Sequence, residues 1–219
     1  MIRNERGSGE PESALARAVL LDDIDTVRAL LERGEDPNSR VVTLTPEAVA
    51  AFTPEMLESI SETVLIVATE RGFLVTAKAL IAAGADVNFL TAKGTSALIA
   101  AAVSGRPEAA ALLLDNGAAV DLHKEDLDPP IVLAANFGDD RMVALLMAHG
   151  ADVNARGVDG VTALMLAAEG GHDVIVRALI ANGASVNERD DDGHSALWEA
   201  NKNNWPETAA ILAAAGAVG

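Results

Sequence analysis

The chain has 219 residues, half of which are apolar, and it combines a formal net charge of −17 at pH 7 with no cysteine. This composition excludes disulfides and thiol chemistry, and it disfavours direct binding to nucleic acid because phosphate contacts need a basic face. No long apolar run with polar flanks is present, so neither a signal peptide nor a membrane span is expected; a cytoplasmic location is the default, with secretion without a cleavable signal left open.

The first ten residues, 1–10, are charged and contain Gly7-Ser8-Gly9, which predicts a disordered leader. Beyond this leader, six glycines recur along the chain, and the last five are each 33 residues apart. A fixed period of this length predicts stacked copies of one supersecondary unit. The first interval is 50 residues, 17 more than the others, so one unit carries an insertion. The glycines are Gly34, Gly84, Gly117, Gly150, Gly183 and Gly216.

A short first helix is expected near 65–69, 98–102, 164–168 and 197–201, each after a hydroxyl residue that can accept a hydrogen bond from a free N–H of the first turn. The fourth unit has Pro129 at this position, so Asp128 is the nearest substitute for the missing cap. The predicted capping residues are Ser13, Thr63, Ser96, Thr162 and Ser195.

A turn, a second helix and a polar finger complete each unit. The turn residue is one that tolerates positive φ, and the second helix has one apolar face, as at Ile175, Val176, Leu179 and Ile180. The glycine that follows suits the end of this helix. About ten polar residues then form an extended, hairpin-like finger. The turn residues are Asp22, Gly72, Gly105, Gly138, Gly171 and Asn204.

These residues resemble the ankyrin repeat. The segments Gly160-Val-Thr-Ala-Leu-Met-Leu-Ala-Ala-Glu-Gly-Gly-His172 and Gly150-Ala-Asp-Val-Asn154 follow the family pattern. The resemblance implies an all-α ankyrin-repeat solenoid of helix-turn-helix units with β-hairpin-like fingers, forming a single domain over 11–219. Its repeats are expected near 11–38, 61–88, 94–121, 127–154, 160–187 and 193–219, with the insertion within 39–62.

No catalytic, metal-binding or cofactor-binding residue is expected. The four histidines fall in different units, and none has the spacing that places two metal ligands on one helix. Motifs for nucleophilic catalysis, phosphate binding or dinucleotide binding do not occur. The closest acid and base cluster, His123 with Glu125, Asp126 and Asp128, is typical of a solvated loop.

The family resemblance implies that finger tips and first helices form a concave face that binds a protein. Phe137 is a candidate anchor in this chain of few aromatic residues, or it folds over the neighbouring turn. Trp198 is expected to pack between units, and Trp205 to cover the end of the last unit. The candidate binding residues, by position, are Glu70, Arg71, Leu90, Lys93, Thr95, Val103, Ser104, Glu125, Asp126, Asp128, Asn136, Phe137, Val158, Asp159, Val161, Glu169, Asp191, Asp192, His194, Lys202 and Asn203.

The insertion contains Thr45-Pro-Glu47 and Thr53-Pro-Glu55, and each triplet is a helix-start signal. Two short helices are therefore expected near 46–51 and 54–60. Their apolar residues, among them Phe52 and Met56, either fold back onto the first two units or form a partner-specific wall beside the groove.

The leading functional hypothesis is a monomeric, non-enzymatic adaptor or scaffold that binds a protein partner, one with a basic surface, through its acidic concave face and the insertion. The alternative is an inhibitor or immunity protein that blocks a basic enzyme or toxin. The acidity is spread along the chain except over 91–124, where charges balance, and it also serves solubility.

Overall fold

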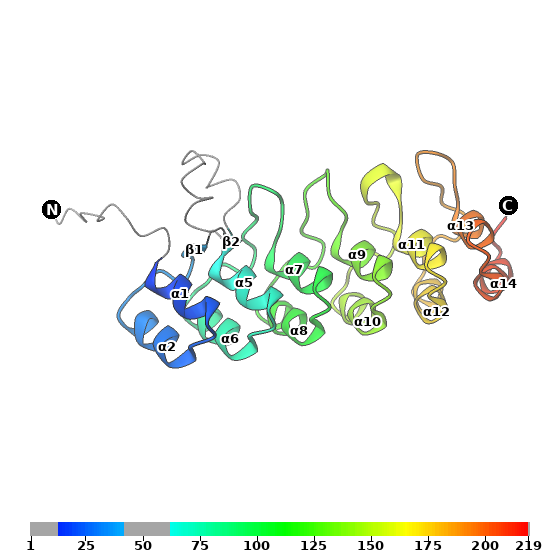
Figure 1. Ribbon diagram of the computed structural model, residues 1–219. Helices are drawn as coiled ribbons and strands as arrows, with labels where there is room; N and C mark the ends of the chain where they lie inside the picture. The colour runs from blue at the N-terminus through cyan, green and yellow to red at the C-terminus, as the bar shows by residue number, and fades with distance from the viewer. Residues whose placement is uncertain (1–12, 42–61, 219) are drawn as a thin grey trace.

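The computed structural model describes residues 13–41 and 62–218, and these residues form a row of paired helices (Figure 1). Each pair joins a first helix of seven residues to a second helix of nine. The pairs are α1 (Ala14–Leu20) with α2 (Ile24–Glu32), α5 (Val64–Glu70) with α6 (Leu74–Ala82), α7 (Ala97–Val103) with α8 (Pro107–Asp115), α9 (Pro130–Asn136) with α10 (Asp140–Ala148), α11 (Ala163–Glu169) with α12 (Asp173–Ala181), and α13 (Ala196–Lys202) with α14 (Pro206–Ala214).

This arrangement confirms the predicted solenoid of helix-turn-helix units. First helices form one row and second helices another, with α1 and α14 at opposite ends of the array (Figure 1). The two helices predicted near 46–51 and 54–60 lie outside the described residues, together with Phe52 and Met56.

Five of the six first helices begin at the predicted hydroxyl cap. In each, the side-chain oxygen accepts a hydrogen bond from the N–H three residues later, at 3.0 to 3.3 Å. The capped N–H groups are those of Ala16, Ile66, Ile99, Met165 and Trp198.

The fourth unit departs from this pattern, and the prediction that Asp128 caps its helix is wrong. Helix α9 begins at Pro130 after Pro129, with no side-chain hydrogen bond at the cap. Asp128 Oδ1 instead accepts a hydrogen bond from the backbone N–H of Val158, at 2.8 Å. Proline at the first helical position has no N–H to satisfy, so the carboxylate is available to the neighbouring finger.

Both columns of turn residues have the predicted backbone conformation. Asp22 and Asn204 have φ of 52° and 59°, and the glycines between them along the column are also at positive φ. The glycines that follow the second helices have φ between 85° and 94°. The 33-residue period therefore marks positions at which the chain must enter the left-handed region.

The fingers project from the row of first helices (Figure 1). Backbone hydrogen bonds from Thr91 to Thr95, from Gly157 to Val161 and from Asp190 to His194 close three of them like hairpins, at 3.0, 2.8 and 3.0 Å. Within the described ranges, regular strands occur only at the base of the first finger, where β1 (Arg40–Val41) pairs antiparallel with β2 (Glu62–Thr63). Arg40 lies opposite Thr63 and Val41 opposite Glu62.

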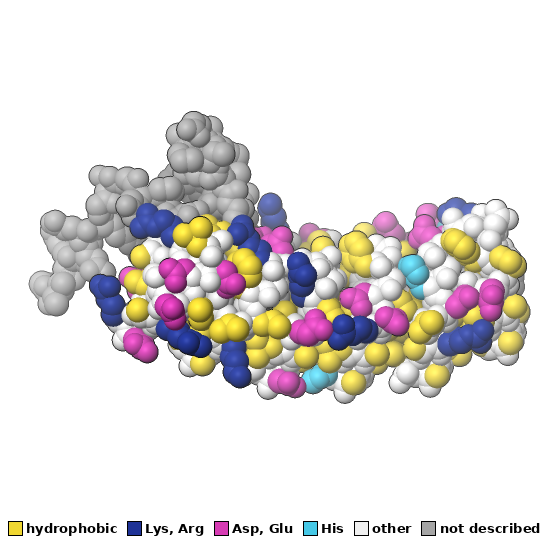
Figure 2. Space-filling view, turned by 60° about the horizontal axis from the view of Figure 1, so that its bottom comes forward, with side chains coloured by type: hydrophobic (Ala, Val, Ile, Leu, Met, Phe, Trp, Pro, Cys, Tyr) yellow, Lys and Arg dark blue, Asp and Glu magenta, His cyan; other side chains and the backbone are white. Residues whose placement is uncertain are grey.

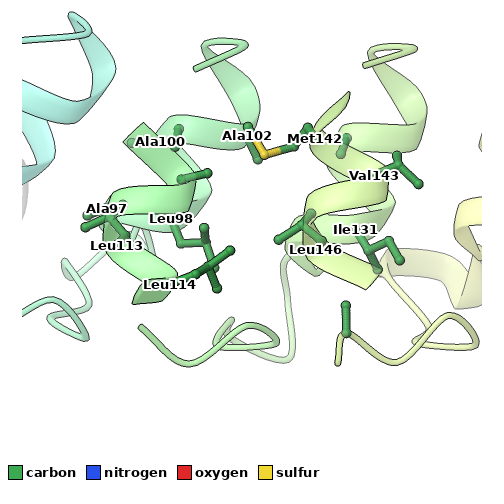
Figure 3. Close-up of a cluster of buried hydrophobic side chains, with 14 of the residues drawn as sticks. Ala97, Leu98, Ala100, Ala102, Leu113, Leu114, Ile131, Met142, Val143 and Leu146 are labelled. Carbon is green, nitrogen blue, oxygen red and sulfur yellow. The ribbon is translucent and has the colours of Figure 1, made fainter. Parts of the chain in front are cut away.

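The core is a ribbon shared between adjacent units. The first helices of the central units are mostly buried, as Ala101 and Ala134 illustrate, and their small side chains let neighbouring units approach closely. Figure 3 shows Met142 of α10 directed toward Ala102 of α7, so apolar contact crosses from one unit to the next. Each unit therefore buries its apolar face against its neighbours.

An asparagine clamp joins successive fingers. Asn88 donates its Nδ2–H to the carbonyl of Gly117 at 3.0 Å, and its Oδ1 accepts the N–H of Ala119 at 2.8 Å. Asn154 and Asn187 make the same two bonds to the units that follow them. The clamp fixes the spacing of adjacent units with donors and acceptors that the repeat supplies at fixed positions.

The third unit has Asp121 in place of the clamp asparagine, and its carboxylate only accepts, from the N–H of Asp152 at 3.3 and 3.4 Å. A carboxylate has no N–H for the carbonyl of Gly150. We expect Asp121→Asn to raise the free energy of unfolding by about 1 kcal/mol, measured by urea denaturation. The matched reverse variant, Asn154→Asp, should lower it by a similar amount; a change of the same sign in both variants would contradict the clamp.

Candidate functional site

Most of the predicted binding residues lie exposed along the fingers and the ends of the first helices, which together we call the inner face. The exposed ones are Glu70, Arg71, Lys93, Val103, Glu125, Asp126, Asn136, Phe137, Val158, Asp159, Glu169, Asp191, Asp192, Lys202 and Asn203. Leu90, Thr95, Ser104, Asp128, Val161 and His194 are half-buried.

Phe137 remains accessible at the end of α9. It is 56% exposed, and the ring that lies over the adjacent turn glycine Gly138 is that of His172 from the next unit. An exposed aromatic ring beside a turn is a suitable anchor for an apolar side chain of a partner. Of the two roles open to Phe137, the accessible one agrees with its exposure.

Several predicted site residues also tie neighbouring fingers together. Asp191 Oδ1 forms an ion pair with Arg156 Nη2 at 3.3 Å, and the backbone N–H of Asp191 donates to the carbonyl of Asp159 at 2.9 Å. Asp128 holds the N–H of Val158 in the same way. These contacts join the tips of the third, fourth and fifth fingers into one continuous edge that is rich in acidic side chains.

The last unit contains a half-buried group of two acids and a histidine. Ligand atoms of Asp190, His194 and Glu199 lie within 4.8 Å of one another. Asp190 Oδ1 already accepts the N–H of His194 at 2.7 Å, and Glu199 Oε2 accepts from Lys202 Nζ at 3.4 Å. Asp190 is therefore engaged within the finger and Glu199 within α13, and we do not assign the group to a metal.

The two tryptophans occupy different kinds of position. Trp198, predicted to pack between units, is 37% exposed, and it stacks on His194 of its own finger with ring centroids 3.6 Å apart. Trp205 covers the turn at Gly171 in the preceding unit and donates its Nε1–H to the carbonyl of Glu169 at 2.8 Å. Trp205 therefore links the last two units, whereas Trp198 shapes the surface of the inner face.

A pocket of about 190 Å³ opens between α5 and α7, on the inner face of the second and third units. Glu62 and Thr95 line it from the ends of the preceding fingers. The two helices and Ser104 at the end of α7 contribute the remaining lining residues, which are Ile66, Glu70, Ile99, Ala100, Val103 and Ser104. The pocket therefore joins an apolar lining to two carboxylates.

The surroundings of Glu62 in the pocket shift the pKa of its carboxyl group. Burial raises the pKa of Glu62, the negative charge of Glu70 raises it further, and Lys93 lowers it. The direction shows that the carboxylate is partly withdrawn from water and faces a second acid. A cation in the pocket would relieve both effects.

The sequence pointed to only part of this pocket. Glu70, Thr95, Val103 and Ser104 were candidate binding positions, and the pocket brings all four together. Ile66 and Ile99 follow the spacing of core residues, and Glu62 lies at the end of the insertion, so none had a signal of its own. Their shared feature is adjacency across units, which a single repeat does not reveal.

The opposite side of the molecule is formed by the second helices. Figure 2 brings the row of second helices forward, where Lys and Arg side chains lie interspersed with Asp and Glu. Arg141 of α10 and Glu108 of α8 form an ion pair of this kind at 2.8 Å. Acidic side chains also lie at the finger tips, for example Glu125 and Asp126, where basic residues such as Lys124 and Arg156 accompany them.

The repeated pairs, the fingers and the clamp define a protein built from ankyrin-type units. The family model of ankyrin repeats (3 copies) matches residues 46–126 and 131–218, so the chain belongs to the ankyrin repeat family. Ankyrin repeats are generally modules for protein–protein interaction and are typically non-catalytic. A search of curated proteins found no match. Among the described residues, no helix has the length and apolar character needed to cross a membrane.

Proposed function

We propose that this ankyrin array is a non-enzymatic adaptor that binds a protein with a basic surface along its inner face. The observation that carries the proposal is the acidic edge of the finger tips above an accessible apolar surface that includes Phe137. Complementary charge speeds the encounter with a basic partner, while a buried aromatic anchor slows dissociation. The insertion within 39–62 borders this face at β1 and β2 and would extend it.

Affinity capture from the source cells, followed by mass spectrometry, identifies the partner, and titration of the purified complex tests the face. We expect Glu125→Lys combined with Asp126→Lys to weaken binding about tenfold or more at low salt, because two exposed acids on the inner face are reversed. The matched control reverses two exposed acids at the ends of second helices, Glu32→Lys with Asp115→Lys.

The control should change affinity by less than about twofold, since charges outside the interface act only at long range. Equal weakening by both pairs, or affinity that is indifferent to salt, would assign the net charge to solubility and contradict the proposed face. An activity assay on the captured partner decides the alternative: a partner inactivated in the complex makes the protein an inhibitor, and one that stays active makes it an adaptor.

A further inference from the structure

The pocket between α5 and α7 has the chemistry of a receptor for a long cationic side chain. We propose that it takes an arginine of the protein partner, with the aliphatic stem on Ile66, Ile99 and Val103 and the guanidinium between Glu62 and Glu70. This inference rests on the proposed binding function and names the chemistry of the occupant. Long basic side chains bury their stems on apolar surface while the charged head keeps polar partners.

The two carboxylates favour a cationic occupant over a neutral one. Glu62 is half-buried, and burial together with the negative charge of Glu70 raises its pKa. Lys93 partly offsets this from an exposed position on the next finger. A cation held between the carboxylates would interact favourably with both and oppose their mutual repulsion.

The insertion cannot supply this cation. Residues 42–61 contain three glutamates and no lysine, arginine or histidine, so covering the pocket with them would bring more negative charge to Glu62 and Glu70. The charge complementarity therefore points to a cation from outside the insertion, and the proposed occupant is an arginine of the partner.

Arginine fits better than lysine or a hydrated metal ion. Half of the residues that line the pocket are apolar, namely Ile66, Ile99, Ala100 and Val103, and they offer no ligand to a strongly hydrated ion. A guanidinium is less strongly hydrated than an ammonium and has five donors in one plane. It can reach the two carboxylates together with the hydroxyls of Thr95 or Ser104.

Methyl NMR of the full chain, titrated with N-acetyl-arginine methylamide, tests the inference without the partner. We expect saturable shifts at the methyls of Ile66, Ile99 and Val103. The citrulline analogue, which keeps the shape and lacks the charge, should bind at least about tenfold more weakly, and the lysine analogue should lie between them.

Glu62→Gln combined with Glu70→Gln should lower the affinity for the arginine probe about tenfold or more, because it removes both charges and preserves side-chain size. The matched control, Glu125→Gln with Asp126→Asn, removes two exposed acids outside the pocket and should leave probe affinity unchanged. Circular dichroism verifies that both pairs stay folded, as expected for a substitution that relieves burial of a charge.

Three results would overturn the inference: no saturable shift, equal binding of the citrulline analogue, or contacts from Phe52 or Met56 to the methyls of Ile66 and Ile99 that persist with probe in excess. The outcome is separable from that of the proposed function. Suppose that the captured partner binds the Glu62→Gln and Glu70→Gln protein normally but loses affinity for the Glu125→Lys and Asp126→Lys protein. The adaptor function would then stand, and the arginine pocket would be contradicted.

Discussion

Replacing Leu146 with alanine should lower the free energy of unfolding by about 3 kcal/mol, the largest loss expected from a single truncation in the array. Leu146 is fully buried in α10, near the middle of the chain, and Figure 3 shows it beside Ile131 of the paired helix α9. The substitution removes apolar contact and leaves a cavity that close-packed neighbours fill only in part.

Urea denaturation monitored by circular dichroism measures this loss. The matched control is Leu21→Ala, which makes the same truncation at a side chain that is 79% exposed and should cost less than about 0.5 kcal/mol. Because each unit is held only by its neighbours, weakening a central unit should also broaden the transition as the two ends begin to unfold separately. Equal losses at both leucines would contradict the assignment of Leu146 to the shared core.

Gly171→Ala should destabilise the protein by about 2 to 3 kcal/mol, because it combines backbone strain with a steric clash. Gly171 has φ of +67°, and a Cβ placed there would lie 2.5 Å from the Trp205 ring of the next unit. The ring cannot withdraw without losing its hydrogen bond to the carbonyl of Glu169.

Gly183→Ala separates the two causes. Gly183 has φ of +90°, and a Cβ added there would meet no atom within 4 Å, so only the strain, about 1 kcal/mol, should remain. Combining Gly171→Ala with Trp205→Ala should recover part of the clash energy and yield less than additive losses in thermal denaturation. Equal effects of the two glycine substitutions would show that Trp205 does not restrict the turn.

The repeat fold was predictable because its signals are local. A glycine, aspartate or asparagine at positive φ and a hydroxyl at a helix start are backbone requirements of single positions, and Asp22, Asn204 and Ser13 meet them as expected. Repetition then multiplies a weak local signal into a specific one.

The candidate site was predictable only in outline. The acidic finger tips follow from the repeat register, but the use of Asp128 does not, because the N–H that it accepts belongs to Val158, thirty residues later. The pocket has the same origin: Ile66 and Ile99 follow the spacing of core residues in their own helices, and only stacking places them beside Glu62. The features that distinguish this chain from a regular repeat array are contacts between units, and the conformational preferences of single residues do not encode such contacts.

The short ladder of β1 and β2 has a consequence for how this protein can change. Val41 and Glu62 face each other across one antiparallel pair, so the chain leaves the stack and re-enters it at adjacent points, about 5 Å apart. The spacing of the first two units is therefore independent of what is inserted between them. This junction is a graft point at which segments of different length can be exchanged, so new specificity can be acquired there without rebuilding the scaffold.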